Sequence, residues 1–97
     1  MSFETQFPER ALITGASRGI GKAVALRLAE EGIAVALVAR SHPDLLAVQA
    51  EIQAKGGKAE VFPIDLADLP ALPQRLQALL DRFGACDVLV NNAGVGY

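Results

Sequence analysis

The stretch Ala11-Leu-Ile-Thr-Gly-Ala-Ser-Arg-Gly-Ile-Gly21 joins a short apolar run to a long amphipathic one, which predicts a turn from a β-strand into an α-helix. Gly15 lets the chain turn sharply off the strand. Gly19 and Gly21 let backbone approach a ligand or a neighbouring strand, because no Cβ intervenes. Free N–H groups of the first helical turn then face outward, with the positive end of the helix dipole behind them. The stretch is therefore predicted to bind a phosphate group.

The glycine spacing is Gly-x-x-x-Gly-x-Gly, which differs from the general Gly-x-Gly-x-x-Gly fingerprint of dinucleotide sites. Taken alone, this spacing also fits a plain glycine-rich turn between a strand and a helix. The strand before it, the helix after it and the charges further along the chain favour the phosphate-binding interpretation.

The composition describes one small domain with an aliphatic core. Of the 97 residues, 52% are hydrophobic but only 5% are aromatic, which suits parallel strands covered by helices. A formal net charge of -2 offers no basic field for nucleic acid. The longest apolar run, Ile33 to Ala39, is too short to span a bilayer, and residues 1–8 lack the pattern of a secretory signal. We expect a soluble cytoplasmic protein that binds neither nucleic acid nor membranes and holds no metal.

Cys86 is the single cysteine, so it forms no internal disulfide. It lies just before an apolar strand. We interpret it as a small filler, and a reactive thiol is the alternative.

Four apolar segments of strand length alternate with helical patterns along the chain. Strands are expected at residues 10–14, 33–39, 58–64 and 87–91. Pro63 lacks an N–H donor, so the third of these strands is placed near a sheet edge. Short connections between alternating strands and helices predict right-handed βαβ units in a doubly wound parallel α/β sheet.

The three helices are predicted from apolar residues at helical spacing. The first has the stripe Ile20, Val24 and Leu28 and ends at Gly32. The second opens at Pro43, capped by Ser41 or His42, and has the stripe Leu45, Val48 and Ile52. The third is capped by Asp68, ends at Gly84, and has the stripe Leu72, Leu76, Leu79, Leu80 and Phe83.

Polar residues follow several of the predicted strands. In a sheet of this kind the ligand crevice lies off the carboxyl ends of the strands. Those ends are Thr14, residues 39–41, residues 64–66 and residues 91–94, and three of the four carry polar groups directly after an apolar run. Residues at strand ends are also often polar simply because they reach water. The alternative is therefore that these polar residues have no role in ligand binding.

Arg40 is the most informative of these residues. No acidic residue stands directly at the end of the second strand, where one would accept hydrogen bonds from the ribose hydroxyls of NAD. Instead Arg40 is followed by Ser41, and Arg18 projects from the glycine turn. Two guanidinium groups could converge on a ribose 2′-phosphate, which favours NADP(H) over NAD(H). The alternative is a solvated arginine at a strand end.

Two further strand ends carry side chains suited to a nucleotide. Asp65 could accept a hydrogen bond from an adenine amino group, with Leu66 against the ring, or could simply stabilise a turn. Asn91 and Asn92 end the fourth strand, where amides bond neighbouring backbone or a ligand, and Gly94 permits close approach. Structural and binding roles both remain open.

Together these motifs resemble the short-chain dehydrogenase/reductase family. They are Thr14-Gly-x-x-x-Gly-Ile-Gly21, Arg40, Asp65-Leu66 and Asn91-Asn92-Ala93-Gly94. The resemblance spans nearly the whole chain and implies the Rossmann fold, here with strand order 3-2-1-4. Residues 12–21 look most like those of NADP-dependent members, 3-oxoacyl-carrier-protein reductases among them. The resemblance also implies an oxidoreductase that moves hydride between nicotinamide and a small-molecule carbonyl or alcohol. Members of the family are commonly homo-oligomers.

The resemblance also implies roles for individual residues. The cofactor phosphates and the adenosine ribose would be bordered by Gly15, Ser17, Arg18, Gly19, Ile20 and Gly21. Arg40, with Ser41 beside it, would meet the 2′-phosphate. Asp65 and Leu66 would flank adenine. Asn91, Ala93 and Gly94 would lie along the ribose, while the amides steady the sheet.

The family's catalytic residues have no counterpart in this sequence. Family chemistry needs a tyrosine, a lysine four residues later and a serine upstream, but Tyr97 is the only tyrosine and the last residue. A strand at residues 88–90 would also lie at an open sheet edge. We therefore predict that residues 1–97 are the N-terminal part of a single dinucleotide-binding domain in a longer enzyme. The alternatives are a non-catalytic NADP(H)-binding module and an inert half-domain that pairs its exposed strand with another chain.

Overall fold

The computed structural model describes residues 10–84 and 86–91, in which strands and helices alternate as predicted. The elements are β1 (Arg10–Thr14), α1 (Gly19–Glu30), β2 (Ala34–Ala39), α2 (His42–Ala54), β3 (Ala59–Pro63), α3 (Leu72–Phe83) and β4 (Val88–Val90). Each strand lies within a residue or two of its expected position. None of the helices in this part of the chain has the length and apolar character needed to cross a membrane.

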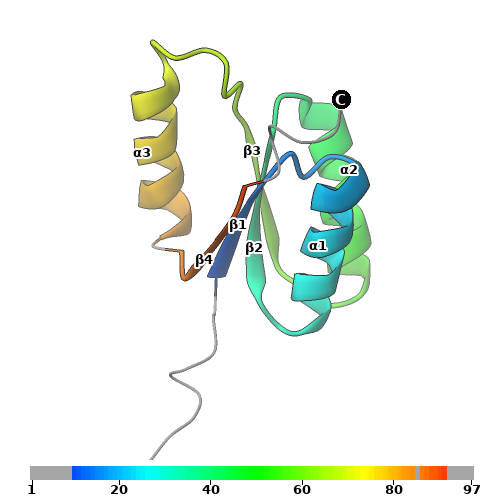
Figure 1. The fold of residues 1–97 in the computed structure, drawn as a ribbon. Coiled ribbons are helices and arrows are strands. Elements are labelled where there is room, and N and C mark those ends of the chain that lie inside the picture. Colours follow the sequence, from blue (N-terminus) through cyan, green and yellow to red (C-terminus); the bar gives the residue numbers. More distant parts are fainter. Residues whose placement is uncertain (1–9, 85, 92–97) are drawn as a thin grey trace, which may run out of the picture.

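The four strands form one parallel sheet in the order β3-β2-β1-β4, which confirms the predicted order. β1 is central, with Ala11 opposite Val35 of β2 on one side and Val88 of β4 on the other. Helices α1 and α2 cover one face of the sheet, and α3 lies on the other (Figure 1). All four carboxyl ends therefore reach the same edge of the sheet, where a ligand crevice is expected.

Helix α1 packs on the sheet through its smallest residues. Gly21, Ala25 and Ala29 are buried at four-residue spacing, so the helix backbone can approach the strands closely. The prediction that Ile20 begins the buried stripe is wrong, since its side chain is 65% exposed. Leu28 packs against the core only from its margin. Close approach selects small side chains over more hydrophobic ones here.

Helix α2 follows its prediction closely. Ser41 is the N-cap, Pro43 lies in the first turn, and Leu45, Val48 and Ile52 are buried. These three side chains join α1 and the sheet in one aliphatic cluster.

The start of α3 differs from the prediction. Asp68 was expected as its cap, but the helix begins at Leu72 after Ala71, with no side-chain cap. Asp68 instead lies in a turn, where its carbonyl oxygen accepts a hydrogen bond from the N–H of Ala71 at 3.2 Å. Residues 68–71 form a turn before α3, because the N–H groups of Ala71 and Leu72 bond to carbonyl oxygens three residues back, those of Asp68 and Leu69, rather than four.

The α3 side of the sheet is less completely covered than the other. Leu79 is the one fully buried residue of α3, and it joins Val38 and Phe62 of the sheet in a second cluster. Leu80 is 45% exposed, and Leu89 on the edge strand β4 is 66% exposed. Within the described residues, this face and edge present apolar surface to solvent, in line with the expected open edge at residues 88–90.

We predict that Gly57→Ala destabilises the fold. A Cβ at Gly57 would stand 2.7 Å from the Cγ2 atom and 3.2 Å from the carbonyl oxygen of Ile52, and 3.3 Å from the Cβ of Ala29. Overpacking of this kind costs about 1–3 kcal/mol. Urea denaturation should show this loss, whereas Lys58→Ala, at an exposed neighbouring side chain, should change stability little. Equal stability of the Gly57 variant and the parent chain would contradict the packing described.

Candidate nucleotide site at the carboxyl edge of the sheet

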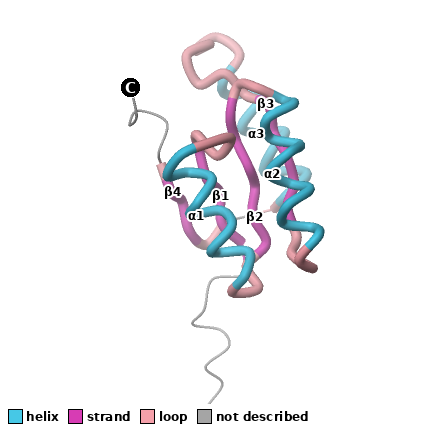
Figure 2. Tube along the Cα trace, turned by 90° about the vertical axis from the view of Figure 1, so that its right-hand side faces the viewer, coloured by secondary structure: helices cyan, strands magenta, loops and turns pink. Residues whose placement is uncertain are grey.

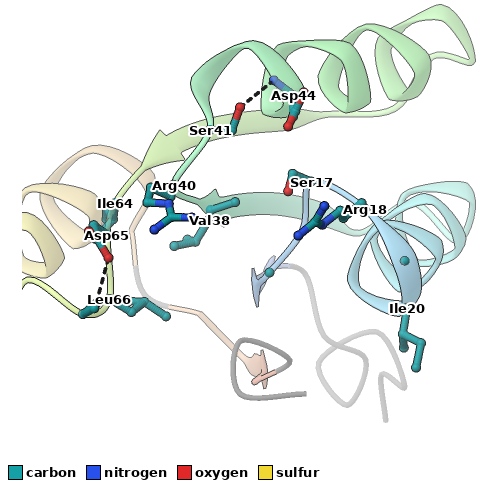
Figure 3. A pocket seen from close by; sticks show the side chains of 14 residues that line it. Ser17, Arg18, Ile20, Val38, Arg40, Ser41, Asp44, Ile64, Asp65 and Leu66 are labelled. Carbon is teal, nitrogen blue, oxygen red and sulfur yellow. Dashed lines mark hydrogen bonds between the residues drawn. The ribbon is translucent and has the colours of Figure 1, made fainter. Parts of the chain in front are cut away.

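A cavity of about 740 Å³ lies at the carboxyl ends of β1, β2 and β3 (Figure 3). Its position agrees with the crevice expected from the parallel strand order. Nine of the predicted site residues line it: Gly15, Ser17, Arg18, Gly19, Ile20, Arg40, Ser41, Asp65 and Leu66.

The turn between β1 and α1 forms one wall of this cavity. Gly15 and Gly19 have φ angles of 64° and 62°, in the left-handed region that favours glycine. The N–H of Ala16 donates to the carbonyl oxygen of Val38 at 3.1 Å, which holds the turn against β2. A Cβ at Gly19 would meet no heavy atom within 4 Å, so backbone conformation rather than space requires glycine there.

The N-terminus of α1 is free to receive an anion. No side chain caps it, and its first turn contains no acidic residue. Helix α2 differs, because Ser41 caps it by accepting from the N–H of Asp44 at 3.5 Å. The first N–H groups of α1 therefore remain available beside the cavity, with the helix dipole behind them.

Arg18 and Arg40 bring two positive charges to the cavity from different elements. Arg18 precedes α1, Arg40 follows β2, and their side chains point toward one another across the space between them (Figure 3). Both residues are exposed, and no ion pair of the described residues involves either of them. Two guanidinium groups so placed can bind one phosphate by forked hydrogen bonds.

Comparison with known proteins identifies the family. Residues 9–97 match the family model of the short chain dehydrogenases. The chain belongs to the short-chain dehydrogenase family.

Two curated relatives of the chain are named as reductases. The chain is 48% identical to a fatty acyl-CoA reductase of Acinetobacter baylyi over 84 residues, which are 87% of this chain and 28% of that protein. It is 46% identical to the 3-oxoacyl-[acyl-carrier-protein] reductase FabG of Staphylococcus aureus over 86 residues, which are 88% of this chain and 35% of that protein. The chain thus spans about a third of the length of these relatives.

Solved structures of the same family have the same fold. A metagenomic short-chain oxidoreductase in complex with NADP is 48% identical, with a TM-score of 0.83 over 92% of this chain and 40% of that one. L-Sorbose reductase from Gluconobacter frateurii, complexed with NADPH and L-sorbose, is 36% identical. Its TM-score is 0.81 over 92% of this chain and 34% of that one.

Asp65 has a structural role in the turn after β3. Its Oδ1 atom accepts a hydrogen bond from the N–H of Ala67 at 2.9 Å, which fixes the turn after β3. Leu66, beside it, lines the cavity and packs against the cluster under α3. The turn that the sequence analysis gave as the structural alternative for Asp65 is present. The expected contact of Asp65 and Leu66 with adenine stays a prediction.

Two predicted site residues lie beside the cavity rather than in its wall. Gly21 is buried in the first turns of α1. Asn91 follows β4, and its Oδ1 atom accepts a hydrogen bond from Oγ1 of Thr14 at 3.0 Å. This bond joins the ends of β1 and β4, consistent with the expected role of the amide in steadying the sheet. Ala93 and Gly94 lie outside the described residues.

Five residues of the cavity wall were not among the predicted site residues, although two of them, Ala39 and Ile64, belong to the strand ends expected at the crevice: Val38, Ala39, Asp44, Ile64 and Ala67. Four of them are apolar neighbours of residues already chosen at the ends of β2 and β3. The sequence did contain an indication that Asp44 lies near the site. It lies three residues after the capping Ser41, and side chains three apart share one face of a helix.

Cys86 lies away from this cavity and is half-buried. Burial raises the pKa of its thiol, the negative charge of Asp87 raises it further, and Arg10 partly offsets both effects. A thiol that stays protonated at neutral pH is a weak nucleophile. Its surroundings therefore favour the filler role over the reactive one.

We predict that Cys86 is alkylated slowly at neutral pH. Because its pKa is raised in the folded chain, the iodoacetamide reaction should accelerate only at a pH above that needed for the urea-unfolded chain. The same shift means that folding favours the protonated thiol, so stability should fall as the pH rises through the raised pKa. A rate that already levels off near neutral pH would show a reactive thiol instead.

Proposed function

We propose that this chain is the NADP(H)-binding portion of an oxidoreductase that transfers hydride between nicotinamide and a small-molecule carbonyl or alcohol. The observation that carries the proposal is the convergence of Arg18 and Arg40 on one cavity, beside the uncapped N-terminus of α1. NADP(H) carries a 2′-phosphate, which the two arginines can bind, and a pyrophosphate, which the N-terminus of α1 can bind.

The residues of the cavity suit the adenosine half of this cofactor. The left-handed glycine turn and the first N–H groups of α1 would hold the pyrophosphate. Arg18 and Arg40, with the Ser41 hydroxyl, would hold the 2′-phosphate. Asp65 and Leu66 would contact adenine. The bound cofactor supplies the hydride chemistry, and the chain's own residues bind it and orient it.

Relatives support both the cofactor and the reaction class. The two solved structures described above are complexes with NADP and with NADPH, and the curated relatives are named as reductases of an acyl-CoA and an acyl-carrier-protein substrate. We infer a carbonyl or alcohol substrate and NADP(H) in preference to NAD(H). The same proposal includes a cytoplasmic location and a homo-oligomeric state. Both are supported by the likeness to the family.

We infer that the catalytic residues belong to a part of the enzyme outside residues 1–97, which form the N-terminal part of one dinucleotide-binding domain. The chain matches only 28% and 35% of the length of the two relatives. The exposed Leu80 and Leu89 support further elements on the α3 face and beside β4.

We predict that Arg40→Ala selectively weakens NADPH binding. Removing a charged hydrogen-bond partner of the 2′-phosphate should cost about 1.5–3 kcal/mol, whereas NADH binding should barely change. Fluorescence titration of the purified chain with each cofactor measures both affinities.

Arg27→Ala is the matched control for this experiment. Arg27 lies in the last turn of α1, and its exposed side chain pairs with Glu31 at 3.4 Å. The variant loses the same charge away from the cavity, so both affinities should match those of the parent chain. Equal losses of NADPH and NADH binding in the Arg40 variant would contradict the assignment of the 2′-phosphate.

A further inference from the structure

Asp44 places a negative charge in the cavity that the proposed function does not use. It lies in the first turn of α2 and lines the cavity together with Arg40 and Ser41. Figure 3 shows its side chain turned toward the glycine turn that bears Ser17, on the far side of the cavity. An acidic residue in the first turn of a helix interacts favourably with the helix dipole, and this accounts for Asp44 at the start of α2. The dipole does not account for the effect of the Asp44 charge on a ligand in the cavity.

The charged side chains that line the cavity are balanced. Two arginines, Arg18 and Arg40, face two aspartates, Asp44 and Asp65. Asp65 is engaged by the Ala67 N–H at the end of β3. Asp44 shares the α2 side of the cavity with Arg40, and no ion pair of the described residues joins it to either arginine. Its charge is therefore not cancelled by an ion pair with either arginine, and a negative charge in the cavity wall repels an anion in the cavity.

We propose that Asp44 is a specificity-determining residue that limits the preference of this cavity for NADP(H) over NAD(H). Its carboxylate opposes the 2′-phosphate that Arg40 attracts. A free ribose hydroxyl can donate a hydrogen bond to the same carboxylate, which a phosphate oxygen cannot do. The inference rests on the proposed function, and it makes NAD(H) a secondary ligand of the site.

Asp44→Asn tests the inference, because it removes the charge and keeps the size of the side chain. The ratio of the NADH dissociation constant to that of NADPH should rise about three- to tenfold, mainly through tighter NADPH binding. This gain should shrink at an ionic strength of about 1 M, where the Debye length is about 3 Å. Binding of each cofactor to the purified chain is followed by fluorescence, so no turnover is needed.

Two further variants separate charge from structure. Asp44→Glu keeps both the charge and the first-turn acid of α2, so its ratio should stay near that of the parent chain. Glu30→Gln removes one negative charge from the last residue of α1, at the opposite end of that helix from the cavity wall. Its ratio should also be unchanged, which excludes an effect of net charge alone.

The possible outcomes distinguish the two proposals. An unchanged ratio in an Asp44→Asn variant that binds both cofactors contradicts the role of Asp44 and leaves the proposed function intact. Equal changes in both affinities also contradict it, because they indicate a purely structural effect. A parent chain that binds neither cofactor overturns the proposed function, and the role of Asp44 with it.

Discussion

The chain leaves β1 at Gly15 and enters α1 at Gly19, and both residues have left-handed backbone with φ near 60°. A side chain in that conformation costs about 1–2 kcal/mol per residue, so two glycines make the turn possible at little cost. The Ala16 N–H fixes the turn to Val38 of β2. This constraint aims the uncapped N-terminus of α1 at the edge where the strands end. The cavity and the position of Arg18 both depend on it.

The same turn determines how α1 packs. A helix that starts so close to the strand end must lie near the sheet, and the buried Gly21, Ala25 and Ala29 make this approach possible. Ile20 is then displaced from the core and lines the cavity. Helices α1 and α2 lie side by side over one face of the sheet (Figure 2), whereas α3, on the other face, buries only Leu79 completely. The cavity wall draws on both packed clusters, with Ala39 from the cluster under α1 and α2, and Val38, Ile64 and Leu66 from the cluster under α3.

Much of this arrangement follows from local sequence. The apolar run that becomes β2 predicts a strand buried on both faces, and Ser41 marks the start of α2 by its own chemistry. The buried face of α1 was misjudged at Ile20 because hydrophobicity ranks isoleucine above glycine, while steric contact with the sheet decides the outcome. Asp68 was misjudged because a hydrogen-bonded turn at residues 68–71 separates it from Leu72, where the helix begins. Asp44 was missed because it lies in the first turn of α2 rather than directly at a strand end, and its place in the cavity depends on three strand ends meeting in space.

We propose that the carboxyl edge of the sheet holds the adenosine half of NADP(H). The most direct measurement is a two-dimensional ¹H–¹⁵N NMR titration of the labelled chain with adenosine 2′,5′-bisphosphate. We expect the largest amide shifts in residues 15–19 and 40–44, on both sides of the cavity. Shifts centred on Leu76 and Leu80 of α3, or no shifts at saturating ligand, would contradict it.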